Sequence, residues 1–130
     1  MSNRRKTGLK SLYRREFLRS PAWFARRDRW FTEQTRRGIP LACAGCDRPA
    51  SKAELELHHL DYRGVTLTAG LWRAAEPHGD LIPLHAYCHE LLHRLIDRDP
   101  VLARHRTRRD ASQHALEHLR TRLASREESA

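Results

Sequence analysis

The spacing of cysteine and histidine is the feature of this sequence that most constrains its fold. Cys43 and Cys46 form a C-x-x-C pair, and His85 and Cys88 form an H-x-x-C pair further along the chain. Two such pairs bring four ligands to one tetrahedral centre, as structural zinc requires. Because the N-terminal stretch lacks the apolar segment of a secretory signal, we expect a cytoplasmic chain, in which three cysteines favour metal over disulfides. The sequence therefore predicts a structural Zn²⁺ held by Cys43, Cys46, His85 and Cys88, with His89, next to Cys88, as the alternative to His85.

A second group of histidines predicts a different kind of metal site. His89 and His93 are four residues apart in a predicted helix, so they share one face and can chelate one cation. His58, at the end of a predicted strand, supplies a third imidazole. Three ligands leave coordination positions open, which distinguishes a catalytic cation from a structural one. His59, the next residue, then points to the other side of the strand and is free to act as a base.

The two motif-bearing segments together resemble a known family. L-E-L-H-H-L-D-Y-R-G, followed by E-P-H-G-D-L-I-P-L-H-A-Y-C-H-E-L-L-H, is similar to the HNH endonucleases of the ββα-metal (His-Me finger) class, in the branch with a zinc knuckle. The resemblance covers about residues 41–95. It implies a core of two strands and one helix, and hydrolysis of DNA phosphodiester bonds. His85 departs from the family pattern, in which a cysteine is usual, although Cys₃His is an ordinary zinc set.

The resemblance also implies roles for individual residues. His59 is the general base that activates water, and Asp80 braces the loop behind the backbone of His59. The ligands of the catalytic cation are His58, His89 and His93. Imidazole ligands suit Mn²⁺, Co²⁺, Ni²⁺ or Zn²⁺ better than Mg²⁺, which prefers oxygen ligands. The predicted catalytic set is His58, His59, Asp80 and His89.

The charge distribution favours nucleic acid as the partner. The whole chain carries a net charge of +9, and residues 1–40 alone hold twelve Lys/Arg against three Asp/Glu. Basic side chains interleaved with aromatic ones are typical of phosphate-binding surfaces. We expect phosphate contacts from Arg63, Arg26, Arg27, Arg36 and Arg37, and from Arg104, Arg106, Arg108 and Arg109 near the C-terminus. No apolar run approaches the ~20 residues that cross a bilayer, so we expect no membrane contact. The sequence leaves the oligomeric state open.

The predicted fold is α+β and mostly helical. Residues 1–40 form a basic helical region, residues 41–98 the ββα-metal core with its zinc knuckle, and residues 99–130 a basic C-terminal helix that restarts at Asp99-Pro100. Ser20 and Pro21 predict the start of an N-terminal helix, whose buried stripe is Trp23, Phe24, Trp30 and Phe31. Two short strands are expected at 54–60 and 80–84, joined by a long loop over 61–79 with one helical turn.

Two functions are consistent with these motifs. The first is a metal-dependent HNH endonuclease that nicks or cuts duplex DNA. The second is a zinc-stabilised nucleic-acid-binding module that does not cut. A binding module needs only the four predicted zinc ligands, whereas the endonuclease also needs the second histidine group, so that group discriminates between the two.

Overall fold

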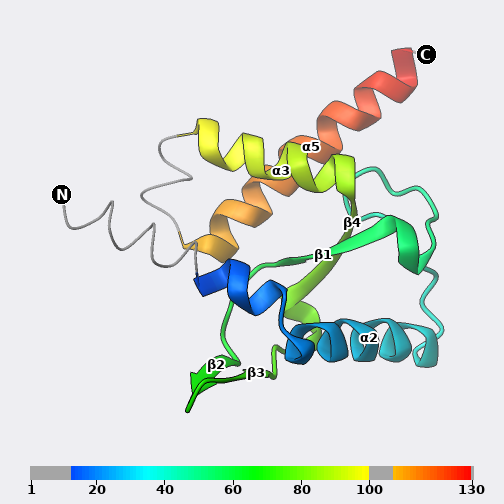
Figure 1. The fold of residues 1–130 in the computed structure, drawn as a ribbon. Helices are drawn as coiled ribbons and strands as arrows, with labels where there is room; N and C mark the ends of the chain where they lie inside the picture. The colour runs from blue at the N-terminus through cyan, green and yellow to red at the C-terminus, as the bar shows by residue number, and fades with distance from the viewer. Residues whose placement is uncertain (1–12, 100–106, 130) are drawn as a thin grey trace.

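The structure, a computed structural model, describes residues 13–99 and 107–129. It consists of helices packed around two small antiparallel sheets, which confirms the predicted α+β class. In Figure 1 the pair of strands β1 (Leu55–His59) and β4 (Leu81–His85) lies between helix α2 (Pro21–Arg36) on one side and helices α3 (Ala86–Arg98) and α5 (Arg108–Ser129) on the other. One hydrophobic core extends through these layers, from Phe17 near the start to Leu119 in α5.

The central unit is a strand–strand–helix arrangement. Strand β1 (Leu55–His59) pairs antiparallel with β4 (Leu81–His85), with Leu57 opposite Pro83 and His59 opposite Leu81. Helix α3 (Ala86–Arg98) follows β4 directly. Both strands lie where the sequence predicts them. A short 3₁₀ turn, η1 (Lys52–Glu54), leads into β1, and another, η2 (His78–Asp80), leads into β4.

Helix α2 (Pro21–Arg36) begins where its capping residues predict. The backbone N–H of Trp23 donates to Oγ of Ser20 over 3.2 Å, and the helix ends before Gly38, whose φ is +69°. Trp23, Trp30 and Phe31 are buried, but Phe24 is 54% exposed, so its assignment to the buried stripe was wrong. Phe24 and Phe31 share a helix face, yet only Phe31 is covered, by Arg27 and Lys52.

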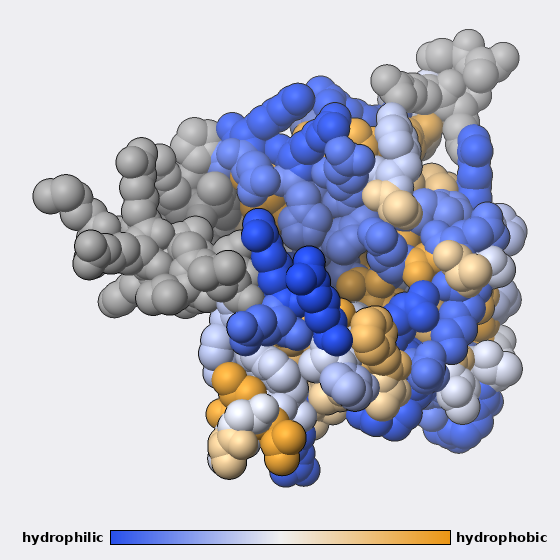
Figure 2. All heavy atoms as spheres, in the orientation of Figure 1, coloured by the Kyte–Doolittle hydropathy of each residue, from blue (hydrophilic) through white to orange (hydrophobic). Residues whose placement is uncertain are grey.

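The segment predicted as a long loop is a β-hairpin instead. Strand β2 (Val65–Thr68) pairs with β3 (Leu71–Ala74) through a two-residue turn in which Ala69 and Gly70 both have positive φ. That geometry defines the tight turn that matches the twist of paired strands. Gly64 permits the hairpin to close, because a Cβ there would lie 2.4 Å from the carbonyl oxygen of Ala75. Figure 2 shows hydrophobic residues gathered over this hairpin, where Leu71 is 75% exposed.

Helix α5 (Arg108–Ser129) packs against α3 through its small and apolar residues. Ala111, Ala115 and Leu119 are buried on the packed face. The helix start that the sequence predicts at Pro100 lies outside the described residues. Among the described residues, no helix has the length and apolar character needed to cross a membrane.

Candidate metal centres

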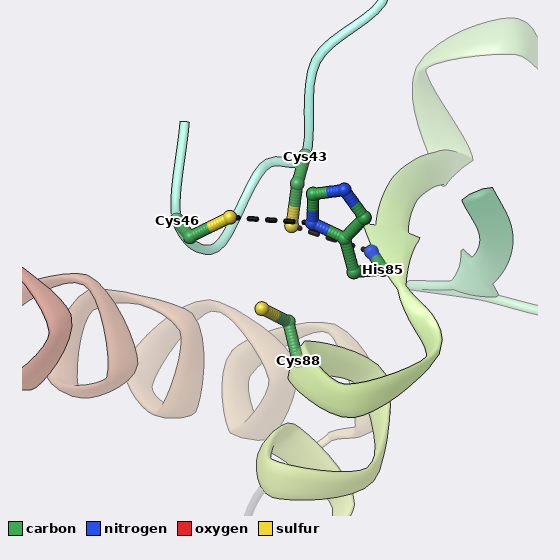
Figure 3. Close-up of side chains that lie close together, drawn as sticks. All are labelled: Cys43, Cys46, His85 and Cys88. Carbon is green, nitrogen blue, oxygen red and sulfur yellow. Dashed lines mark hydrogen bonds between the residues drawn. The ribbon is translucent and has the colours of Figure 1, made fainter. Parts of the chain in front are cut away.

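The four predicted zinc ligands lie together at the junction of the core elements. Cys43 and Cys46 occupy the turn before β1, His85 ends β4, and Cys88 lies in the first turn of α3 (Figure 3). One ligand atom from each residue lies within 4.8 Å of the others. Sγ of Cys46 is 3.3 Å from Nδ1 of His85, so this imidazole offers Nδ1 to the cluster. The cluster that the sequence predicts is therefore present, with His85 as its fourth member.

The electrostatics of this cluster fit a bound cation. Burial alone would raise the pKa of Cys43, but backbone N–H groups of Cys46, His85 and Gly45 point at its sulfur and hold the pKa below its ordinary value. Burial and the neighbouring Cys43 raise the pKa of Cys88 to about 12. Sulfurs this close together oppose each other's ionisation. A divalent cation offsets that effect, because it attracts each thiolate that binds it. All three cysteines are free, and a zinc ion is the group that this Cys₃His set suits.

The second histidine group also converges. His58 projects from β1, and His89 and His93 lie one turn apart on α3, with a ring nitrogen of each within 4.8 Å of the others. Nδ1 of His58 is 3.2 Å from Nε2 of His89, which is 3.0 Å from Nε2 of His93. Imidazole nitrogens bound to one cation at ~2.1 Å lie roughly 3.0–3.4 Å apart, for octahedral to tetrahedral angles. The two distances in this trihistidine cluster are thus compatible with ligands of one cation, as they are with hydrogen bonds between the rings.

The surroundings of the trihistidine cluster favour neutral imidazoles. Burial, with Arg108 nearby, holds the pKa of His58 far below its ordinary value. Burial also lowers the pKa of His93, to about 4. Nδ1 of His89 lies 2.9 Å from Oε1 of Glu56, which is two residues before His58 in β1 and therefore on the same face of the strand. A neutral ring with one nitrogen hydrogen-bonded outward presents the lone pair of its other nitrogen, which is the form that binds a cation.

His59 lies on the opposite face of β1 from the trihistidine cluster. Its ring is packed between Trp23 and Tyr62, with ring centroids at 4.6 and 4.2 Å, and its side chain is 2% exposed. Nε2 of His59 is 2.7 Å from Oε2 of Glu76, whose side chain is fully buried. Oε1 of Glu76 has no hydrogen-bond partner among the described residues. Burial lowers the pKa of His59 despite the opposing effect of Glu76.

Asp80 is buried beneath the end of β1 and braces the chain beside His59. Its carbonyl oxygen accepts a hydrogen bond from the backbone N–H of Leu60 over 2.8 Å. Its carboxylate accepts from Arg63 over 2.7 Å and from Arg109 over 2.5 Å. Burial alone would raise the pKa of Asp80, but these two arginines outweigh it and hold the pKa below its ordinary value. Asp80 thus fastens β4 and α5 to the segment after His59.

Replacing Asp80 by asparagine should destabilise the fold, because two arginines lose the charge of their common partner. We expect the free energy of unfolding to fall by about 1–3 kcal/mol. Urea unfolding of the zinc-loaded chain measures this change. Asp61→Asn is the matched control: Asp61 lies 3.7 Å from Arg109 and is 42% exposed, so its replacement should cost under about 0.5 kcal/mol. Equal losses in both variants would contradict the bracing role of Asp80.

The arginines of α2 and its C-terminal end that we expected to contact phosphate differ in their burial and in their partners. Arg26 is buried, and its guanidinium donates twice to the carbonyl oxygen of Glu76, so its position does not support a phosphate contact. Arg27 donates to the carbonyl oxygens of Lys52 and Leu55. Arg36 and Arg37 are exposed but both pair with Glu33.

Two of the C-terminal arginines also form hydrogen bonds or ion pairs within the fold. Arg108 donates to the carbonyl oxygen of His59 over 2.7 Å and stacks over Tyr62, while Arg109 and Arg63 pair with Asp80. Arg104 and Arg106 lie outside the described residues. The side chain of Arg63 is 63% exposed, beside Asp80.

Comparison with known proteins gives no match: neither a protein-family model, nor a curated protein, nor a solved structure is similar to this chain. What the chain does must therefore be inferred from the geometry of the two clusters and their surroundings.

Proposed function

We propose that this chain is a metal-dependent endonuclease of the HNH type, which hydrolyses phosphodiester bonds in DNA with one catalytic divalent cation. The observation that carries the proposal is the convergence of His58, His89 and His93 at metal-ligand spacing, separate from the Cys₃His cluster. A purely structural zinc module has no use for a second cluster of this kind. A cation bound there would neutralise charge on the scissile phosphate and on the leaving oxygen.

His59 is the proposed general base. Glu76 accepts the Nε2–H of His59, which leaves the lone pair of Nδ1 to take a proton from water. A carboxylate that fixes the tautomer and orientation of a histidine base is a recurring arrangement in hydrolytic sites. The lowered pKa of His59 keeps the ring neutral, and thus able to accept a proton, at neutral pH.

The charge of the chain supports a polyanionic substrate. The net charge is +9, and Arg63, whose side chain is 63% exposed although it pairs with Asp80, is the arginine that we expect to contact a phosphate near the end of β1. The free cysteines, gathered in one cluster, are in keeping with the reducing conditions of the cytoplasm, where we place this activity.

Plasmid cleavage tests the proposal. Zinc-loaded wild-type chain should nick or linearise supercoiled DNA when Mn²⁺, Co²⁺ or Ni²⁺ is added, and EDTA should abolish the reaction. His89→Ala removes one ligand, so cleavage should fall by at least about tenfold and recover in part at high metal concentration. His118→Ala, an exposed histidine on α5, is the matched control and should cut like wild type. Failure of the wild type to cut DNA with any of these metals would contradict the proposal.

One observation favours the second candidate, a zinc-stabilised nucleic-acid-binding module that does not cut. His59 is 2% exposed, so water reaches it only if the packing of Trp23 and Tyr62 opens when DNA binds. Binding of labelled duplex DNA without cleavage, in wild type and His89→Ala alike, would make the module the better description. Its affinity should fall with salt by about 0.9 log units per log unit of salt for each phosphate contact.

A further inference from the structure

Ser112 contacts the trihistidine cluster from the far side of His58. It lies on α5, is fully buried, and its Oγ is 2.8 Å from Nε2 of His58. We propose that Ser112 is a positioning residue of the cation site: it accepts the Nε2–H of His58 and thereby directs the lone pair of Nδ1 toward the cation. The inference rests on the cation-binding part of the proposed function and does not depend on DNA cleavage.

The two ring nitrogens of His58 face different neighbours. Nδ1 is 3.2 Å from Nε2 of His89, inside the trihistidine cluster, whereas among the described residues Nε2 has the hydroxyl of Ser112 as its hydrogen-bond partner. A neutral imidazole carries one N–H and one lone pair. The proton must lie on Nε2 if Nδ1 is to bind a cation, so whatever accepts that proton controls whether His58 can act as a ligand.

Burial makes this control strong. His58 is 1% exposed, so a proton on Nε2 without an acceptor would be an unpaired donor inside the fold. The ring would then favour the other tautomer, with its proton on Nδ1, pointing into the cluster where it blocks a cation. Ser112 removes that penalty. Ala111 and Ala115, neighbours of Ser112 on α5, are buried with it.

His89 shows the same logic with a different acceptor. Its Nδ1 lies 2.9 Å from Oε1 of Glu56, so it presents Nε2 to the cluster. Glu56 comes from β1 and its side chain is 54% exposed, whereas Ser112 comes from α5 and is fully buried. Two of the three imidazoles are thus oriented by acceptors from different elements. The consequence is that α5 completes the cation site, although it contributes no ligand.

Metal titration tests the inference. Zinc-loaded wild type, Ser112→Ala, Ser112→Thr and Ser125→Ala are titrated with Ni²⁺ by calorimetry. The Kd of Ser112→Ala should be about 10–100-fold higher than that of wild type. Ser112→Thr keeps the hydroxyl and should recover most of the affinity, while Ser125→Ala makes the same change elsewhere on α5 and should bind like wild type. Zinc content should stay at one ion per chain in every variant. A Ser112→Ala Kd within twofold of wild type would overturn the inference.

A second measurement needs no variant. Long-range ¹H–¹⁵N spectra of histidine-labelled, zinc-loaded wild type should show His58 as the Nε2–H tautomer before Ni²⁺ is added. The Nδ1–H tautomer, or no Ni²⁺ binding by wild type, would overturn the inference. Ni²⁺ binding that depends on Ser112 in a chain that cuts no DNA would refute the nuclease alone. Plasmid cleavage by wild type with undiminished Ni²⁺ binding by Ser112→Ala would refute the role of Ser112 alone.

Discussion

Cys88→Ser should unfold the chain under conditions in which the wild type is folded. A structural zinc contributes on the order of 10 kcal/mol or more to the folding of a small domain, which is comparable to the whole stability of a typical domain, about 5–15 kcal/mol. Cys88 is 3% exposed, and it joins α3 to the turn that holds Cys43 and Cys46. Without its sulfur the other members of the cluster are left buried with a weaker site. Elemental analysis should find less than one zinc per chain, and circular dichroism should show loss of helix.

His85→Ala should have a smaller effect on zinc binding and stability than Cys88→Ser. His85 is half-buried at the edge of the cluster, and three sulfurs remain after its removal, so we expect weaker zinc binding and a lower melting temperature in a chain that still folds. His118→Ala, the same substitution at an exposed position of α5, should leave both quantities unchanged. A zinc-free Cys88→Ser chain that melts at the wild-type temperature would contradict a structural zinc at this cluster.

The sequence predicted which residues gather in the two clusters because much of their spacing is local. Cys43 and Cys46 lie in one tight turn, and His89 and His93 lie one turn apart on α3, so each pair is set by the geometry of its own element. His58 reaches the His89–His93 pair through the antiparallel contact of β1 with β4; the alternation around Leu55 and Leu57 predicted the strand, and the family resemblance implied its pairing.

Partners from distant segments could not be predicted in this way. Glu76 meets His59 only because the hairpin β2–β3 folds the intervening chain back on itself, and the glycines and proline of that segment predicted a loop. The alternation V-T-L-T before Ala69 and Gly70 was the available signal, weakened by an alanine in a turn position that usually carries asparagine, aspartate or glycine. Ser112 meets His58 across 54 positions, and one serine in a helix signals nothing.

Charge counting also overlooked how many arginines donate hydrogen bonds within the fold. Arg26 lies on the same helix stripe as Trp23 and Trp30, at spacings of three and four residues, which indicates burial. The structure uses Arg26, Arg29 and Arg120 to donate to the backbone carbonyl oxygens of Glu76, Ala74 and Ala44. Net charge alone does not distinguish an arginine that pairs within the fold from one that meets a phosphate.

His59→Asn should lower the rate of plasmid cleavage by about 10²–10⁴-fold, the usual contribution of a general base. Asparagine removes the proton acceptor, but its amide takes the place of Nδ1 and does not reach Glu76 as Nε2 of His59 does, so thermal unfolding of the variant must show that the fold is retained. Because His59 faces Trp23 and Tyr62 rather than the trihistidine cluster, the Kd for Ni²⁺ should stay within a few-fold of wild type. Parallel cleavage assays and metal titrations of the two proteins measure both quantities.

The decisive comparison is with His89→Ala. Loss of a ligand is a loss of affinity, so raising the Ni²⁺ or Mn²⁺ concentration should restore part of the cleavage by His89→Ala. Loss of the base is a loss of chemistry at a filled site, and no metal concentration should rescue His59→Asn. His114→Asn, the same substitution at an exposed position of α5, controls for the change itself and should cut like wild type. If His59→Asn cuts as fast as wild type, or if added metal rescues it as it does His89→Ala, His59 is not the base, and the proton acceptor must be sought on the same side of β1 as His58.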